Sequence, residues 1–201
     1  MKSKEYKYFR FFYILVYLPV MLLYRVRAVG RENIPEGGAV FCANHSNWAD
    51  PFLLVFALKR KNYVHIMAKV ELFKNKLIGW ALKLMGMISV NRGATDINSI
   101  KSALRYLHND EKICIFPEGT RISEDFAVAA KNGAIKIAEK SGKPIVPVHI
   151  PRRKHLFGSV KVVIGEPYYI NPERRRLPKE AYDEMAQELM VKIKSLDTEN
   201  I

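Results

Sequence analysis

A histidine and an aspartate five residues apart are the side chains in this sequence best suited to chemistry. They are His45 and Asp50, in the stretch FCANHSNWADPF at residues 41–52. An imidazole can take a proton from an alcohol near neutral pH, provided that an acceptor holds its other ring nitrogen. Asp50 is that acceptor if the chain curls between the two residues. However, an aspartate directly before Pro51 and an apolar run is also typical of a helix N-cap. Both interpretations can hold, since a capping carboxylate has a fixed direction.

Two further polar segments each follow an apolar run. GMISVNRG, residues 86–93, brings Arg92 to the end of its run, and FPEGTR at 116–121 follows KICI. The second segment supplies Glu118, Gly119, Thr120 and Arg121. A glycine lets backbone N–H groups approach a ligand, and arginine offers a planar fork to phosphate oxygens. One such arginine is ordinary surface charge, but two at strand ends in a basic protein favour a phosphate site.

The elements that must position these residues alternate along the chain. Helical patterns follow Thr95, a suitable N-cap, and occupy residues 131–141 and 179–196. Strands alternating with helices predict an α/β domain with a mixed, largely parallel sheet flanked by helices, in which chemistry gathers where strands end. Six short apolar runs are typical of buried strands: residues 38–44, 62–69, 87–91, 112–117, 144–150 and 160–165.

Charge and length narrow the class of partner. The 201 residues suffice for one domain, and the net charge of +13 indicates an anionic partner. Nucleic acid is not expected, because the sequence has no known binding motif or aromatic-basic stripe. Cys42 and Cys114 each lie in an apolar run and are expected to be buried thiols rather than a disulfide or part of a metal cluster.

The N-terminal segment points to a membrane surface as the anionic partner. Residues 11–24, FFYILVYLPVMLLY, are uncharged, have basic flanks and include Pro19. The run is shorter than the roughly 20 residues of a spanning helix, and no signal-peptide cleavage site is evident. Interleaved aromatic residues suit a helix lying in the headgroup region, although a core helix of a soluble protein remains an alternative. We therefore expect a membrane-associating helix at 1–28 and an α/β domain at 29–201.

Basic clusters at 151–154 (PRRK) and 174–176 (RRR) lie in predicted loops. Solvated surface charge is the default interpretation of both. Together with the N-terminal helix they could also contact anionic lipid.

The sequence resembles the glycerolipid acyltransferases, and specifically the bacterial 1-acylglycerol-3-phosphate acyltransferases. NHSNWAD at 44–50 matches the N-H-x-x-x-x-D signature of that family, and FPEGTR is similar to its third block. GMISVNRG resembles the second block and IVPVHI, residues 145–150, the fourth, while VGRENIP and AKVELF are similar to flanking patterns. Four blocks in the same order and spacing make the resemblance specific. One departure is Ala130, where the family usually has phenylalanine.

The resemblance implies a reaction and a set of roles. His45 would act as general base on the free hydroxyl of lysophosphatidic acid, which attacks the acyl thioester of acyl-CoA or acyl-carrier protein. Asp50 would orient His45, and no acyl-enzyme would form, in keeping with the lack of a G-x-S-x-G elbow around Ser46. No cofactor or metal is implied, and the enzyme would work at the cytoplasmic face of the membrane. The acceptor's glycerol phosphate would be bound by Arg92, Glu118, Gly119, Thr120 and Arg121, together with Lys69.

Two alternatives stay open. The acceptor could be glycerol 3-phosphate or another lysophospholipid, or the chain could be a non-catalytic lipid-binding protein with a vestigial site.

Overall fold

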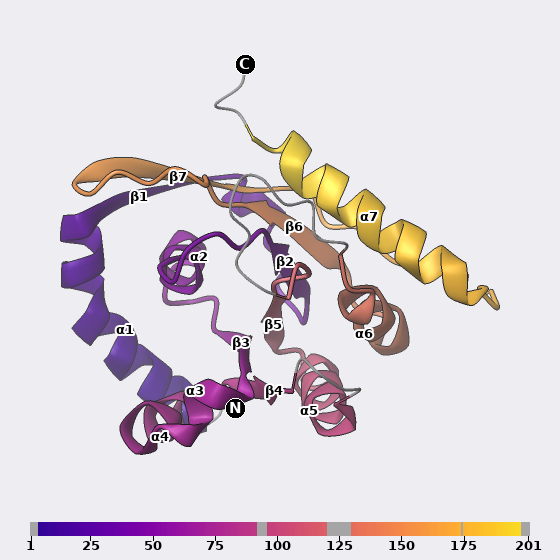
Figure 1. The fold of residues 1–201 in the computed structure, drawn as a ribbon, viewed down its shortest axis with the longest axis horizontal. Coiled ribbons are helices and arrows are strands. Elements are labelled where there is room, and N and C mark those ends of the chain that lie inside the picture. Colours follow the sequence, from indigo (N-terminus) through magenta and orange to yellow (C-terminus); the bar gives the residue numbers. More distant parts are fainter. Residues whose placement is uncertain (1–3, 92–95, 120–129, 174, 198–201) are drawn as a thin grey trace.

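A computed structural model describes residues 4–91, 96–119, 130–173 and 175–197 (Figure 1). Its elements run in order α1 Lys4–Leu23, β1 Tyr24–Val29, the 3-10 turn η1 Arg31–Asn33, β2 Val40–Ala43, α2 Asp50–Leu58, β3 Val64–Lys69, α3 Val70–Lys74, α4 Lys76–Leu84, β4 Ile88–Val90, α5 Ile97–His108, β5 Lys112–Ile115, α6 Gly133–Ser141, β6 Ile145–His149, β7 Gly158–Ile164 and α7 Lys179–Ser195.

The described strands form one seven-stranded sheet in the order β1-β7-β6-β2-β5-β3-β4. Five consecutive strands, β6, β2, β5, β3 and β4, are parallel to one another. β1 is parallel to β7, and the β6–β7 pair is antiparallel. The mixed, largely parallel sheet predicted from the alternation of runs is therefore confirmed.

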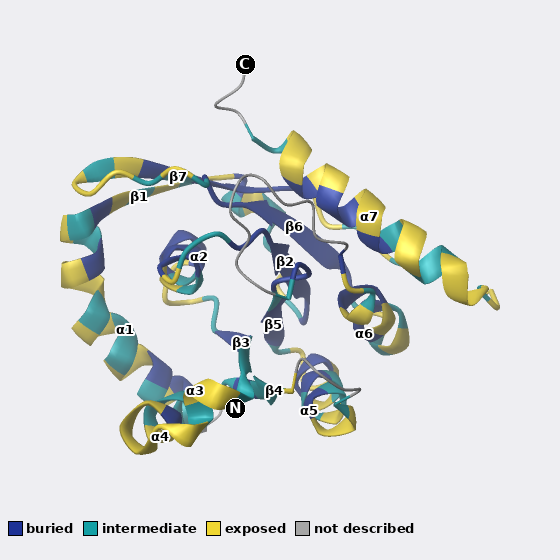
Figure 2. Ribbon diagram, in the orientation of Figure 1, coloured by how far each residue is buried: buried dark blue, intermediate teal, exposed yellow. Residues whose placement is uncertain are grey.

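Helices cover both faces of this sheet, as parallel strands require. On β2, Phe41 and Ala43 belong to the apolar cluster under α1 and α2, whereas Val40 and Cys42 belong to the cluster under α5, α6 and α7. All four residues are buried, so the strand is an unbroken apolar run rather than an alternating one. Figures 1 and 2 show the same division, with the central strands dark blue between the two groups of helices.

The N-terminal region differs from the sequence expectation in two ways. The helix continues through Pro19 to Leu23, and residues 24–29 form β1 at the edge of the sheet instead of extending the helix to residue 28. The alternating polar and apolar residues YRVRAV are typical of an edge strand, but they follow an apolar helix without a turn signal.

Two other local differences concern helix starts. Helices α3 and α4 lie at residues 70–74 and 76–84, where no element was predicted: α3 is only five residues long and has no side-chain cap, and the Asn75 side chain that caps α4 was overlooked as a signal. Thr95, the predicted cap of α5, lies outside the described residues. The side chain of Asp96 accepts a hydrogen bond from the backbone N–H of Ser99 and caps that helix.

A glycine is required where β1 leaves the sheet. Gly30 has φ of +79°, and a Cβ placed there would lie 2.0 Å from the carbonyl oxygen of Ile164. Gly133, in contrast, opens α6 in an ordinary helical conformation with nothing within 4 Å of its hypothetical Cβ. Gly30 and Gly133 therefore allow a matched comparison of alanine substitution at a crowded glycine and at an open one.

Gly30→Ala is expected to lower the free energy of unfolding by at least about 2 kcal/mol, since it combines a left-handed backbone with an overlap of atoms. Gly133→Ala should leave stability unchanged or raise it by up to about 1 kcal/mol. Urea denaturation of the purified proteins measures both. Equal urea midpoints for the two variants would contradict the requirement for a glycine at the end of β1.

Candidate active site

The residues predicted for catalysis and binding lie at or just after the carboxyl ends of strands that share one edge of the sheet. His45 follows β2, Glu118 follows β5, and Lys69 is the last residue of β3. Because β2, β5 and β3 are parallel neighbours, with Cys42 level with Ile115 and Ile66 level with Cys114, their ends lie together. The residues expected to act on one substrate thus lie around one edge.

His45 and Asp50 are brought together. Nδ1 of His45 lies 3.0 Å from Oδ2 of Asp50, and both side chains are buried. The neutral imidazole donates its Nδ1–H to the carboxylate, which leaves the lone pair on Nε2. The ring also stacks on Phe116, with the ring centroids 4.4 Å apart. The imidazole is held on one edge and one face, with Nε2 as its basic atom.

Asp50 does not cap α2 as the sequence suggested. It is the first residue of that helix, Ala49 occupies the N-cap position, and no cap side chain hydrogen-bonds the helix. Instead, Oδ2 accepts hydrogen bonds from the backbone N–H groups of Ser46 and Asn47, each at 2.7 Å. The carboxylate therefore points back into the turn and fixes the loop that carries His45.

The other carboxylate oxygen faces a lysine far away in the sequence. Nζ of Lys154 lies 2.8 Å from Oδ1 of Asp50, and the lysine side chain is 1% exposed. Burial acts to raise the pKa of Asp50, but the hydrogen bond with His45 and the charge of Lys154 outweigh it, so the pKa is lowered. Surface charge, the default interpretation of the PRRK cluster, is thus wrong for Lys154. No signal in that cluster distinguishes its lysine from its arginines.

Glu118 supports the histidine from the neighbouring strand. Its Oε2 accepts a hydrogen bond of 2.9 Å from the backbone N–H of His45, and its Oε1 lies 3.6 Å from a guanidinium nitrogen of Arg152. Burial raises the pKa of Glu118, while the bond from His45 and the charge of Arg152 oppose that rise. The buried carboxylate joins the loop after β5 to the loop after β2.

Asn44 makes a second contact between the loops of the site, which was not predicted from the sequence. Its side-chain amide donates to the carbonyl oxygen of Ile150 at 2.7 Å and accepts from the Ile150 N–H at 2.8 Å. This two-point contact ties the loop after β2 to the loop after β6. Asparagine directly before His45 in a buried segment was the only sequence signal for it.

The predicted phosphate-binding set is described only in part. Arg92, Thr120 and Arg121 lie outside the described residues. Gly119 has φ of +68° and packs against the side chain of Lys131, where a Cβ would lie 3.1 Å from Cε. Lys69 is partly exposed at the end of β3. Among the described residues, no group of three or more His, Cys, Asp or Glu side chains is arranged to hold a metal ion.

Comparison with known proteins is consistent with this geometry. Residues 25–151 match the acyltransferase family model. A 1-acyl-sn-glycerol-3-phosphate acyltransferase of Bacillus subtilis is 37% identical over 86% of this chain and 88% of its own. One from Streptococcus pneumoniae is 28% identical over 90% of this chain and 71% of its own.

A solved structure shares the fold. The crystal structure of the 1-acyl-sn-glycerophosphate acyltransferase from Thermotoga maritima superimposes with a TM-score of 0.65 at 23% identity, over 96% of this chain and 78% of that one. The family model spans His45, Asp50 and Glu118, and the Bacillus relative is matched over most of its length. The chain therefore belongs to the acyltransferase family.

Proposed function

We propose that the protein transfers a fatty acyl chain from an acyl thioester to the free hydroxyl of lysophosphatidic acid, which yields phosphatidic acid. The buried His45–Asp50 pair at the carboxyl edge of the sheet is the observation that carries the proposal. The similarity to proteins named 1-acyl-sn-glycerol-3-phosphate acyltransferase supports the choice of acceptor. The donor is acyl-CoA or acyl-carrier protein, since either carries the required thioester.

In this mechanism, Nε2 of His45 takes the hydroxyl proton while the oxygen attacks the thioester carbonyl. The carbon–oxygen bond forms, the carbon–sulfur bond breaks, and the proton passes from the imidazolium to the departing thiolate. Asp50, hydrogen-bonded at Nδ1, orients the ring and stabilises the imidazolium. The hydroxyl attacks directly, so no acyl-enzyme forms.

Binding of the acceptor's glycerol phosphate is assigned to Arg92, Gly119, Thr120 and Arg121, with Lys69. Glu118 belongs to the same block, and its contacts support a narrower role. Its carboxylate engages the His45 N–H and faces Arg152, and a buried negative charge would repel a phosphate directly. We therefore assign Glu118 to the placement of His45 at the substrate site.

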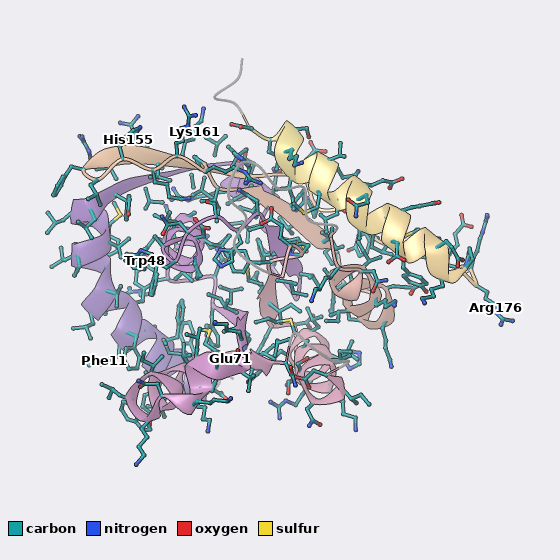
Figure 3. All side chains as sticks on the ribbon, in the orientation of Figure 1. Phe11, Trp48, Glu71, His155, Lys161 and Arg176 are labelled. Carbon is teal, nitrogen blue, oxygen red and sulfur yellow. The ribbon has the colours of Figure 1, made fainter. Side chains whose placement is uncertain are left out.

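Membrane association is inferred from an exposed apolar surface on α1. Among the described residues, one helix, Glu5–Leu23, is long and apolar enough to cross a membrane by length and composition. Its outward side is exposed, with Leu18 at 67%, and Figure 3 shows Phe11 on that outward side. Basic residues flank the apolar stretch, which suits attraction to anionic lipid at the cytoplasmic surface.

Helix α4 extends this surface. It contacts α1 and exposes Leu77 at 74%, together with Ile78 and Trp80, between Lys76 and Lys83. Tryptophan and lysine around exposed aliphatic side chains are typical of the interfacial zone of a bilayer. We infer that α1 and α4 lie against the same membrane.

The proposed base is tested by substitution. His45→Ala is expected to lower the transfer rate about 10³- to 10⁴-fold, and Asp50→Asn about 10²- to 10⁴-fold, because the first removes the proton acceptor and the second its orienting charge. His108→Ala, an exposed histidine at the end of α5, is the matched control and should retain full activity. Initial rates with lysophosphatidic acid measure all three. A His45→Ala protein with full activity would rule out the proposed base.

Acceptor and donor are tested in one competition assay. Lysophosphatidic acid, glycerol 3-phosphate and lysophosphatidylcholine are offered together with either acyl-CoA or acyl-carrier protein, and the acylated products are separated. Phosphatidic acid is expected as the main product, since the assigned cations recognise a terminal phosphate. Acylation of glycerol 3-phosphate instead would change the acceptor. Absence of any product with both donors would leave a non-catalytic lipid-binding protein.

A further prediction concerns the membrane surface. The double variant Leu15→Glu/Leu18→Glu is expected to bind vesicles of phosphatidylcholine and phosphatidylglycerol at least about 10-fold more weakly, because each exposed leucine would contribute about 1.5–3 kcal/mol when the lipid buries it. Val191→Glu, on the exposed side of α7 and across the sheet, is the control and should bind like the parent. Vesicle co-sedimentation gives the comparison. Undiminished binding of the double variant would exclude α1 as the docking element.

A further inference from the structure

Lys154 is a buried cation at the site, and it belongs to none of the four blocks that resemble the family. It lies in the loop between β6 and β7, and its side chain is 1% exposed. Its ammonium contacts Oδ1 of Asp50 at 2.8 Å, Oγ of Ser46 at 2.9 Å and the carbonyl oxygen of Arg152 at 3.4 Å. The contacts with Ser46 and Arg152 are hydrogen bonds, and the contact with Asp50 Oδ1 is an ion pair between buried groups. Lys154 is thus an internal part of the site rather than a surface charge offered to a ligand.

The two carboxylate oxygens of Asp50 have different partners. Oδ2 receives the His45 ring and the N–H groups of Ser46 and Asn47, while Oδ1 faces Lys154. A carboxylate held at only one oxygen can rotate about its terminal torsion, which is broad. With a cation fixed at the second oxygen, rotation would separate two buried opposite charges. Lys154 therefore sets the direction in which Asp50 meets Nδ1 of His45.

The ammonium of Lys154 also affects the protonation of the His45–Asp50 pair. In the part of the chain that the structure describes, the charged or titratable groups around His45 lie on three loops: Asp50, Glu118, Arg152 and Lys154. Lys154 is the one whose ammonium lies within ion-pair distance of the His45 partner, inside a medium with little water to screen it. A positive charge there keeps Asp50 ionised. It also opposes the protonation of Nε2 that would turn the neutral His45 ring into an imidazolium.

We propose that Lys154 is a positioning residue of the acyl-transfer site, which fixes the Asp50 carboxylate and favours a neutral His45 ring beside an ionised Asp50. The proposal rests on the proposed function, in which His45 is the base. It assigns to the loop after β6 a part in catalysis in addition to packing. It also explains why a lysine is buried there, since an ammonium is stable inside a protein only with an anionic partner.

The sign of the pH effect follows from the charges. Without Lys154, the buried carboxylate has lost its cation, so the pair takes up a proton more readily and at higher pH. The base is protonated in a larger fraction of molecules at neutral pH, and the acid limb of the kcat/KM profile moves upward. The rate recovers in part when the pH is raised, which a purely structural defect would not produce.

The test compares Lys154→Met, Lys154→Arg and Lys140→Met with the parent and with His45→Ala. Methionine keeps the length of the side chain without its charge, and arginine keeps the charge with a different geometry. Lys140 is exposed in the last turn of α6, at the opposite edge of the sheet, and is the matched control. Rates are measured from pH 5.5 to 9 over a range of lysophosphatidic acid concentrations, and thermal unfolding midpoints are recorded for each protein.

Lys154→Met is expected to lower kcat about 10- to 100-fold at pH 7 with little change in KM, because the loss is one of alignment and charge rather than of substrate contact. Its acid limb should move up by about one pH unit. Lys154→Arg should keep the parental acid limb and recover part of kcat, and Lys140→Met should match the parent throughout.

Two outcomes separate this proposal from the proposed function. Full activity of His45→Ala would overturn the base itself. An inactive His45→Ala with a Lys154→Met protein that keeps the parental rate and acid limb would overturn only the role of Lys154. If Lys154→Met does not fold, Lys154→Arg decides: a displaced acid limb or an unchanged kcat overturns the proposal.

Discussion

The site depends on one buried carboxylate. Asp50 is 0% exposed, and a charge in that position is stable only if every partner is in place. Its two oxygens hold the His45 ring, two backbone N–H groups of the same turn and the ammonium of Lys154. A single group thereby orders the loop after β2, orients the His45 ring and contacts a loop more than 100 residues away.

The parallel sheet makes this convergence possible. β6, β2 and β5 are adjacent and parallel, so the loops that follow them leave from the same edge. Three polar contacts then join these loops: Asn44 with Ile150, His45 with Glu118, and Asp50 with Lys154. Each of these side chains is buried, and unpaired polar groups there would be costly, so the loops favour one arrangement. The chemistry is held by loops, but their geometry is set by strand order.

The sequence predicted well those features that depend on local pattern. Buried strands appeared as apolar runs, the helical pattern at residues 131–141 corresponds to α6, and the sheet was recognised as largely parallel from the alternation of elements. The His45–Asp50 contact could also be predicted, because five residues of turn allow it.

Features that depend on distant pairings could not be predicted in this way. A turn-forming aspartate and an N-capping aspartate look the same before Pro51, and only the fold shows that the Asp50 carboxylate points backwards. Lys154 resembles its basic neighbours until β6 and β2 are placed side by side. Strand β1 was missed because its pairing partner, β7, lies more than 130 residues further along the chain.

The junction between α1 and β1 has a mechanical consequence. The helix ends at Leu23 and the strand begins at Tyr24, so no flexible linker separates the exposed apolar helix from the sheet. β1 pairs with β7 at six residue positions, along its whole length. A protein anchored through such a junction cannot swivel on the bilayer as a tethered domain would. With α1 docked on a membrane as proposed, the carboxyl edge of the sheet would keep one tilt and one height above the lipid, and lysophosphatidic acid would reach it by diffusion in two dimensions rather than three.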